Sequence, residues 1–315
     1  MDRIVASARP GGRLSRRSAV GRIVSAGAAV ISTTLYPGLP RGAARAAAHR
    51  RQLSVITTQK GTTMTDATPT AAAPLTVVLV HGAFADASNW AGVIPTLQAA
   101  GVGVLAPANP LRGITHDAEY IANLVSQIPG PVVLVGHSYG GAVITNAGSR
   151  ADNVGALVYV GAFIPDEGET LQSLAEQATD SQVLPALRPS PYPTPEGAEP
   201  DVEFTIDPAA FHDVFCADLP ADQAAILAVS QRPLAGFSFG EPKRNPAWKS
   251  LPTWAVISPN DIVIGPAGER AMAERAGATI TEVEASHAMM ISQPQVIADV
   301  ILSAVDAVRT MAVAA

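Results

Sequence analysis

The stretch Val132-Val133-Leu134-Val135-Gly136-His137-Ser138-Tyr139-Gly140-Gly141 decides the fold. Its first four residues are apolar, and such a run is typical of a strand buried on both faces of a parallel sheet. The next five fit the pattern G-x-S-x-G, and the segment after them, up to Ala147, is predicted to be helical. A sharp turn from strand to helix needs glycines on both sides of the serine, and it places the hydroxyl at the carboxyl end of the sheet. The stretch therefore predicts that Ser138 is a nucleophile.

Short apolar runs of the same kind recur on both sides of this stretch. They lie at 75–80, 102–105, 156–160, 253–257 and 278–283. The segments between them carry apolar residues at helical spacing, at about 90–100, 117–128, 141–147, 268–276 and 293–311. Alternating strands and helices predict an α/β fold with a mainly parallel, doubly wound sheet.

One connection in this pattern is too long for a simple crossover. Roughly ninety residues separate the strands at 156–160 and 253–257, whereas ordinary connections need far fewer. The segment is rich in proline between 185 and 200, and helical patches follow at 208–215 and 221–230. We interpret about 163–248 as an inserted helical lid over the active site; the alternative is a surface insertion without a function.

A nucleophilic serine needs a histidine to take its proton and a carboxylate to orient that histidine. Only His212 and His287 follow Ser138 in the chain, and His212 falls in the expected lid. His287 comes after the last predicted strand, where a loop at the carboxyl end of the sheet would carry it to the serine. Asp261 is the only carboxylate in the loop after the strand at 253–257, and the alternative is that it merely caps the following turn. These positions predict the triad.

The tetrahedral intermediate of such a reaction needs two backbone N–H donors. One is expected from the residue after the nucleophile, Tyr139, and the other from the loop after the first strand, at Ala83. His81 in that loop is expected to have a structural hydrogen-bonding role. The lid supplies six of the seven Phe residues of the chain, so we expect an apolar substrate pocket that includes Phe84, Phe211 and Phe215.

The net charge of −6 is unevenly distributed, with +10 on residues 1–63 and −16 on the remainder. The acidic body disfavours nucleic acids and membrane surfaces as partners and favours a small neutral substrate. A single cysteine, Cys216, excludes an internal disulfide and a cysteine-based zinc site. No metal or nucleotide motif was found, so no metal and no cofactor is expected.

Residues 1–63 are expected to lie outside the fold, with 64–74 as a flexible lead-in and 75–315 as the domain. Arg16-Arg17 and the apolar residues after them fit a twin-arginine export signal. The alternative that we favour is a start at Met64, because Gln59-Lys60-Gly61 back-translates to a purine-rich sequence like a ribosome-binding site. That start predicts a cytoplasmic protein, and the signal predicts export.

Residues 77–84 and 136–141, together with Asp261 and His287, resemble the α/β-hydrolase superfamily. The similarity is strongest to its small branch of plant methyl-ester esterases and hydroxynitrile lyases. It implies six parallel strands, a helical lid and no cofactor. Lyases of that branch have threonine where this chain has Gly82 and lysine where it has Ala288. The resemblance therefore implies a serine esterase that hydrolyses carboxylic esters.

Two alternatives use the same residues. A cofactor-free perhydrolase would have the same triad, and a hydrolase-derived receptor for small molecules would keep the pocket but turn over little substrate. Haloalkane dehalogenases and epoxide hydrolases of similar order are excluded, because their nucleophile is Asp and position 138 is Ser.

Overall fold

The six apolar runs predicted as strands form one sheet. A computed structural model describes residues 74–193, 201–242 and 244–314. The sheet has the order β2-β1-β3-β4-β8-β9, and all its neighbouring strands are parallel. Its strands are β1 (Thr76–Val80), β2 (Gly103–Leu105), β3 (Val132–Ser138), β4 (Val154–Ala162), β8 (Thr253–Ile257) and β9 (Thr279–Glu282). The predicted fold class is confirmed, whereas segment 1–63 and the lead-in up to residue 73 lie outside the described residues.

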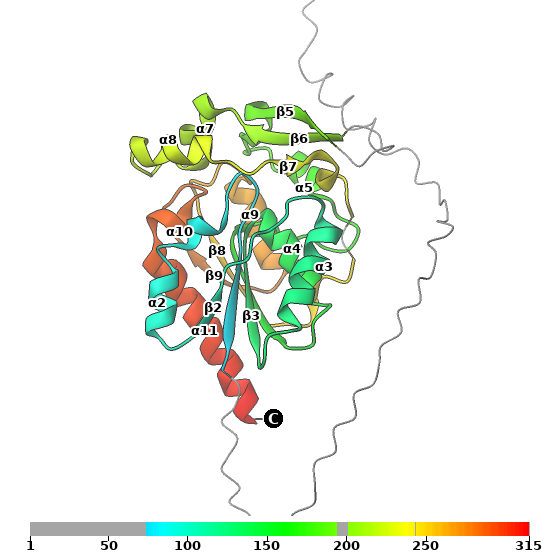
Figure 1. Cartoon of the computed structure of the whole chain (residues 1–315), viewed down its shortest axis with the longest axis vertical. Helices are drawn as coiled ribbons and strands as arrows, with labels where there is room; N and C mark the ends of the chain where they lie inside the picture. Colours follow the sequence, from blue (N-terminus) through cyan, green and yellow to red (C-terminus); the bar gives the residue numbers. More distant parts are fainter. Residues whose placement is uncertain (1–73, 194–200, 243, 315) are drawn as a thin grey trace, which may run out of the picture. The chain divides into compact units, whose positions relative to one another are not determined.

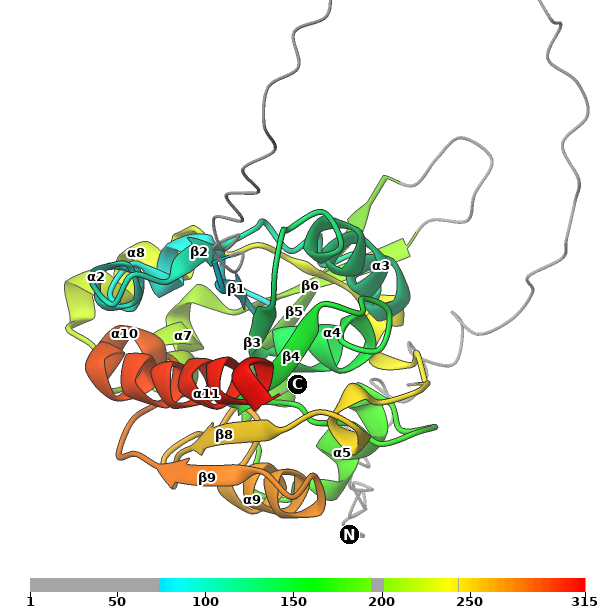
Figure 2. The same cartoon turned by 90° about the horizontal axis from the view of Figure 1, so that it is seen from below.

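The sheet is covered by helices on both faces because alternate residues of each strand enter different cores. In β3, Val132 and Leu134 belong to one core, and Val133 and Val135 belong to the other. Helices α3 (Ile114–Val125), α4 (Tyr139–Ala147) and α9 (Pro266–Arg275) supply side chains to the first core. The second core is closed by η1 (Ala87–Trp90), α2 (Ile94–Ala99), α10 (Met289–Ser292) and α11 (Pro294–Ala314), as Figures 1 and 2 show.

The strand order places two loops beside each other at the carboxyl end of the sheet. The chain leaves β1 for the edge strand β2 and then returns to β3 on the other side of β1. Open α/β sheets bind ligands at such a change of direction. The register pairs Val80 of β1 with Gly136 of β3, so the loop that begins at His81 lies next to the turn at Ser138.

The long connection between β4 and β8, here called the insert, lies over the carboxyl ends of the strands (Figure 1). Its described elements are α5 (Leu171–Gln177), α6 (Val183–Ala186), β5 (Leu187–Tyr192), β6 (Asp201–Ile206), α7 (Pro208–Phe215), α8 (Ala221–Val229), β7 (Leu234–Ala235), η2 (Gly236–Phe239) and η3 (Ala247–Lys249). Both helical patches expected there are present as α7 and α8. The insert also holds a three-stranded antiparallel sheet, β5-β6-β7, that the sequence did not predict.

Proline explains why this small sheet was missed. Pro189 and Pro191 lie in β5, and proline normally indicates that a segment is not a strand. However, β5 is an edge strand of the small sheet, and its two prolines occupy alternate positions. Ser190, which lies between them, keeps its N–H group free to pair with β6, so the edge tolerates proline.

Among the described residues, no helix combines the length and apolarity needed to cross a bilayer.

Candidate active site

Ser138 lies at the junction of β3 and α4 in a strained backbone conformation. Its φ is 53° and its ψ is −123°, a region that residues other than glycine rarely adopt. The turn is tight, because a Cβ at Gly136 would lie 2.6 Å from the Gly140 carbonyl oxygen. A Cβ at Gly140 would lie 2.4 Å from the Val80 oxygen. The glycines therefore allow three backbone segments to meet around the serine.

The loop after β1 lies directly against Ser138. A Cβ at Gly82 would come within 2.6 Å of the Ser138 Cβ, so the predicted N–H donor of Ala83 belongs to a loop in contact with the serine. Tyr139 is the first residue of α4, and the N–H groups of a first helical turn have no acceptor within the helix. The neighbouring N–H of Phe84 donates to the Arg232 carbonyl instead, at 3.0 Å.

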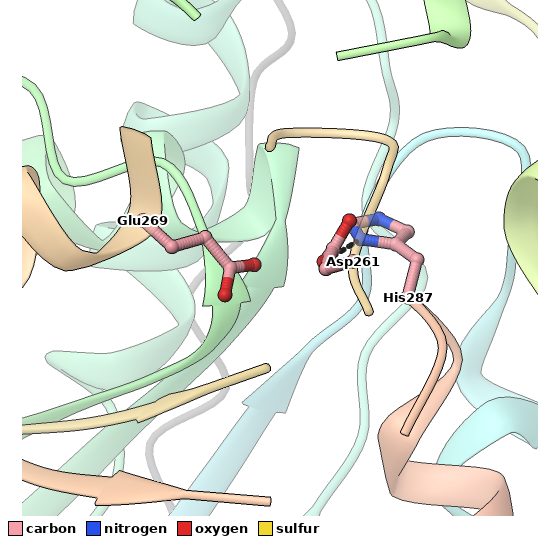
Figure 3. Close-up of side chains that lie close together, drawn as sticks. All are labelled: Asp261, Glu269 and His287. Carbon is pink, nitrogen blue, oxygen red and sulfur yellow. Dashed lines mark hydrogen bonds and ion pairs between the residues drawn. The ribbon is translucent and has the colours of Figure 1, made fainter. Parts of the chain in front are cut away.

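Asp261 and His287 form a buried hydrogen-bonded pair, shown in Figure 3. His287 Nδ1 lies 2.6 Å from Asp261 Oδ2, and neither side chain is exposed to solvent. Asp261 Oδ1 accepts the N–H groups of Val263 and Ile264 at 2.8 and 3.2 Å. Burial alone would raise the pKa of Asp261, but the charge and hydrogen bond of His287, followed by hydrogen bonds from Glu269 and the Ile264 N–H, bring it down to about 2. Asp261 is therefore an anion that orients the imidazole through Nδ1.

The other ring nitrogen of His287, Nε2, is left without a hydrogen-bond partner among the described groups. The structure thus joins Asp261 to His287 but does not join His287 to the Ser138 hydroxyl. The end of β3 that carries the serine lies beside the histidine, because His137, the residue before Ser138, has its ring centroid 4.6 Å from that of His287. Catalytic hydrogen bonds are often long in ligand-free enzymes and tighten once substrate binds.

Two further histidines of the site hold loops in place. His137 Nε2 lies 3.0 Å from the His287 carbonyl oxygen, and burial lowers the pKa of His137 well below its ordinary value. A neutral imidazole can donate through Nε2, which fixes the loop of His287 to the elbow. His81 Nε2 accepts the Asn109 N–H at 2.9 Å, and the Asn109 amide donates to the His81 carbonyl at 3.0 Å. These bonds agree with the structural role expected for His81.

A narrow cavity of about 40 Å³ lies beside Ser138. Its walls come from the core and the insert, and all the lining residues except Ser138 and Tyr139 have apolar side chains. The residues that line it are Ala83, Phe84, Ser138, Tyr139, Phe163, Leu171, Ala175, Val183, Leu184, Leu187, Leu234, Phe239, Val263 and Ile264. Phe84 was expected in this cavity and Phe239 was one of the lid rings considered for it, whereas Phe163 was not expected there.

Phe211 and Phe215, the other two rings predicted for the pocket, do not line this cavity. They line a separate hollow of about 10 Å³ together with Phe84. Phe215 stacks on Phe211 with the ring centroids 4.8 Å apart, and it packs edge-on against His287 at 5.0 Å. The two rings therefore support the histidine. His212, expected in the lid, lies with Nε2 2.9 Å from the Leu219 carbonyl oxygen within the insert.

Glu269 is a residue of the site that sequence reasoning set aside as part of the next helix. Its side chain is buried, and Oε2 accepts the Ser258 N–H at 2.9 Å. One ligand-type atom from each of Asp261, Glu269 and His287 lies within 4.8 Å of the others (Figure 3). Such a group can bind a metal ion, but His287 Nδ1 is already bonded to Asp261. Met272 and Ala273, at helical spacing after Glu269, are buried too and were the available signal.

The sequence profile of the alpha/beta hydrolase family matches residues 77–300. The chain belongs to this family. It is 26% identical to the pyrethroid hydrolase of Sphingobium wenxiniae over 73% of this chain and 88% of that protein. It is 27% identical to Methylesterase 2 of Arabidopsis thaliana, again over 73% of this chain and 95% of the relative. The resemblance to plant methylesterases is thereby confirmed.

Another relative is similar over a shorter part of the chain, and a solved structure has a similar fold. The chain is 34% identical to a carbendazim hydrolyzing esterase of a Nocardioides species, over 34% of this chain and 49% of that protein. Its fold matches that of polyneuridine aldehyde esterase with a TM-score of 0.64 at 23% identity, covering 73% of this chain and 98% of the other. The α/β-hydrolase fold is therefore shown, and the relatives of this family member are esterases and hydrolases of small molecules.

Proposed function

We propose that this protein hydrolyses carboxylic esters of small, largely apolar substrates through an acyl-enzyme intermediate. The observation that carries the proposal is the position of Ser138. The serine lies in a strained turn, with an apolar cavity beside it and the Asp261–His287 pair next to its own neighbour, His137. In this proposal Ser138 is the nucleophile, His287 the general base and Asp261 the group that orients it.

In the proposed reaction Ser138 is first acylated by the ester and then released by water. The Ser138 hydroxyl attacks the ester carbonyl carbon while His287 Nε2 takes the hydroxyl proton, and Asp261 stabilises the imidazolium. The backbone N–H groups of Ala83 and Tyr139 donate to the oxyanion. The intermediate then expels the alcohol, which receives the proton from His287. Water then attacks the acyl carbonyl carbon while His287 takes its proton. The second intermediate releases the acid by breaking its bond to Ser138 Oγ, which receives that proton from His287.

The substrate class follows from the walls of the cavity. All its lining side chains except those of Ser138 and Tyr139 are apolar, so moving an uncharged acyl or alkyl group from water into the cavity costs little free energy. An ionised group would find no counter-charge among those residues. The names of the relatives, a pyrethroid hydrolase and a methylesterase, support ester substrates of this kind. Because eight of the fourteen lining residues come from the insert, we propose that residues 163–248 act as a lid that sets substrate choice.

The decisive experiment tests Ser138. We expect Ser138→Ala to lower kcat/KM for p-nitrophenyl esters by at least about a thousandfold, because the nucleophile is lost. Its melting temperature should stay within about 2 °C of the wild type, since only one hydroxyl is removed. Ser126→Ala is a matched control on an exposed serine and should keep full activity.

A serine-reactive organophosphonate gives a second measurement on the same proposal. Mass spectrometry should locate its adduct on Ser138. Full turnover in Ser138→Ala, or an adduct on a different serine, would contradict the assignment. Tight binding of an ester without steady-state turnover by the wild type would instead favour the receptor.

A further inference from the structure

A second carboxyl group lies beside the proposed catalytic acid. Glu269 comes from the first turn of α9, and Figure 3 shows its carboxyl reaching toward the Asp261–His287 pair. Its side chain is buried, with only 1% of the residue exposed. Gly161 of β4 provides the room, because a Cβ there would lie 3.2 Å from Asp261 Oδ2 and 3.5 Å from Glu269 Oε1. The two carboxyl groups thus converge on the same backbone position.

The hydrogen bonds show which carboxyl carries the negative charge. Asp261 receives three donors, namely the N–H groups of Val263 and Ile264 and Nδ1 of His287. Glu269 receives one, the Ser258 N–H at Oε2, and its Oε1 has no hydrogen-bond partner among the described groups when both carboxyls are treated as acceptors. A buried site cannot hold two adjacent carboxylates without a cation, so one proton must remain. The donors place the anion on Asp261 and the proton on Glu269.

The charges around Glu269 lead to the same conclusion. Burial raises the pKa of Glu269 well above its ordinary value, and the negative charge of Asp261 raises it further. Asp180, from the insert, is the other charged group that acts on it, and this group is also acidic. His287 lies on the side of Asp261 opposite to Glu269 (Figure 3), and its Nδ1 is already hydrogen-bonded to Asp261. Every nearby acidic charge therefore favours the neutral form of Glu269.

We propose that Glu269 is a positioning residue that donates a hydrogen bond from its protonated Oε1 to the Asp261 carboxylate. The bond fixes the plane of that carboxylate, so Oδ2 stays directed at His287 Nδ1, and it shares part of the negative charge. This inference rests on the proposed roles of Asp261 and His287. Glu269 itself touches neither the nucleophile nor the substrate cavity.

Two substitutions separate the donated hydrogen bond from the charge. Glu269→Gln keeps a donor in the same place but cannot ionise, so kcat should stay within about twofold of the wild type. Glu269→Leu removes the donor, and kcat should fall by about tenfold or more because the Asp261–His287 pair is less well oriented. Glu274→Gln, on an exposed position of the same helix, is the matched control and should change nothing.

The acid limb of kcat/KM against pH provides a readout that loss of packing alone would not move. Glu269→Gln should leave the midpoint of this limb unchanged within about 0.3 pH units, because a neutral group replaces a neutral group. Glu269→Leu should shift the limb to higher pH, since the unshared charge of Asp261 then stabilises the protonated form of the site more strongly.

The outcomes that overturn the inference are distinct from failure of the proposed function. A shift of the acid limb to lower pH by about half a unit or more in Glu269→Gln would mean that Glu269 is ionised in the wild type. Unchanged kcat and an unchanged acid limb in folded Glu269→Leu would show that no positioning bond exists. The pH dependence of the stability of Glu269→Gln needs no substrate, so it tests the protonation of Glu269 even if the wild type hydrolyses no ester. Ester hydrolysis that is insensitive to Glu269 would leave the function standing alone.

Discussion

At the scale of single residues, the site separates two chemically similar side chains by their surroundings. Asp261 and Glu269 are both buried carboxyl groups, yet the pKa of Asp261 is lowered to about 2 and that of Glu269 is raised. The charge of His287 and its hydrogen bond lower the pKa of Asp261, whereas burial and the negative charge of Asp261 raise that of Glu269. The hydrogen bonds agree, because Asp261 accepts three and Glu269 accepts one. The same logic assigns acids and bases in enzymes that keep one of two carboxyl groups protonated.

This protonation state has a consequence for stability that can be measured without any substrate. In the unfolded chain Glu269 loses its proton near its ordinary pKa of 4.5, whereas in the folded protein it keeps the proton to higher pH. As the pH rises above about 4.5, this group therefore lowers the free energy of unfolding by up to about 1.4 kcal/mol per pH unit. Glu269→Gln removes that loss, so the variant should gain stability over the wild type from pH 5 to pH 8.

Urea unfolding of both proteins at several pH values checks this expectation. Asp261 acts in the opposite sense, since its pKa is lowered and its contribution is lost only as the pH falls from about 3.8 toward 2. It is present in both proteins and cancels in the comparison. Parallel stability curves for Glu269→Gln and the wild type would show that Glu269 ionises in the folded state.

At the scale of elements, the turn between β3 and α4 depends on glycines for space. A Cβ at Gly140 would lie 2.4 Å from the Val80 oxygen, and neither backbone segment can move away without disturbing the sheet. We expect Gly140→Ala to lower the free energy of unfolding by at least about 2 kcal/mol and to reduce the reactivity of Ser138. Chemical denaturation and organophosphonate labelling measure the two effects.

A second glycine provides a control of opposite sign. A Cβ at Gly268, inside α9, would make an ordinary contact of 3.4 Å with the Ala178 Cβ. Because alanine favours a helix over glycine, Gly268→Ala should stabilise the protein by about 0.5–1 kcal/mol. If both alanine variants were equally stable, the close approach at Gly140 would not be what constrains the turn.

The aromatic residues of the insert divide into two groups with different expected effects. Phe239 lines the cavity beside Ser138, whereas Phe211 is fully buried and packs on Phe215 outside it. Phe239→Ala should therefore change the ratio of kcat/KM for bulky and short acyl esters, by an amount equivalent to about 1–3 kcal/mol. Phe211→Ala should mainly lower stability, by about 3–5 kcal/mol.

A panel of p-nitrophenyl esters of increasing acyl length, measured together with thermal melts, distinguishes the two groups. An equal loss on every ester by Phe239→Ala, in proportion to a lower melting temperature, would show that its ring only packs. The proposal that the insert sets substrate choice would then lose its main support.

The elements of the sheet were more predictable than those of the insert. All six parallel strands were predicted within a few residues, because a run such as Val132–Val135 is apolar at every position and has no other stable environment. The three-stranded sheet of the insert was missed, because Pro189 and Pro191 mask a strand that exists only by pairing with β6. Its stability comes from tertiary contacts that local propensity does not contain.

The site divides in the same way. Asp261 and His287 were found from their order after two strands, since parallel strands bring the following loops to one edge. Glu269 was not found, because its importance depends on which face of α9 meets the loop of Asp261. The rings that line the cavity depend likewise on the path of the insert, so Phe239 and Phe163 could not be distinguished from Phe211 in the sequence.

At the scale of the whole molecule, sheet order brings distant residues together. Ser138 ends β3, while Asp261 and His287 follow β8 and β9, and β4 separates the two halves in the sheet. The insert leaves the sheet at the carboxyl end of β4 and lies over this same edge (Figure 1). It is bonded to the site there, since the Ala288 N–H donates to the Phe215 carbonyl at 3.1 Å. The topology thus couples the histidine loop to the segment that covers the cavity.

The segment before the first strand can be removed to test how much of the chain this arrangement requires. The first strand begins at Thr76, and the family profile matches from residue 77. Polyneuridine aldehyde esterase is covered over 98% of its length by 73% of this chain, so its related fold needs no counterpart of the remainder. We expect a protein that starts at Met64 to fold with a melting temperature within about 2 °C of the full chain and to keep its kcat/KM within about twofold. Parallel melts and ester assays of the two proteins test this. An insoluble or inactive shorter protein would show that residues 1–63 contribute to folding.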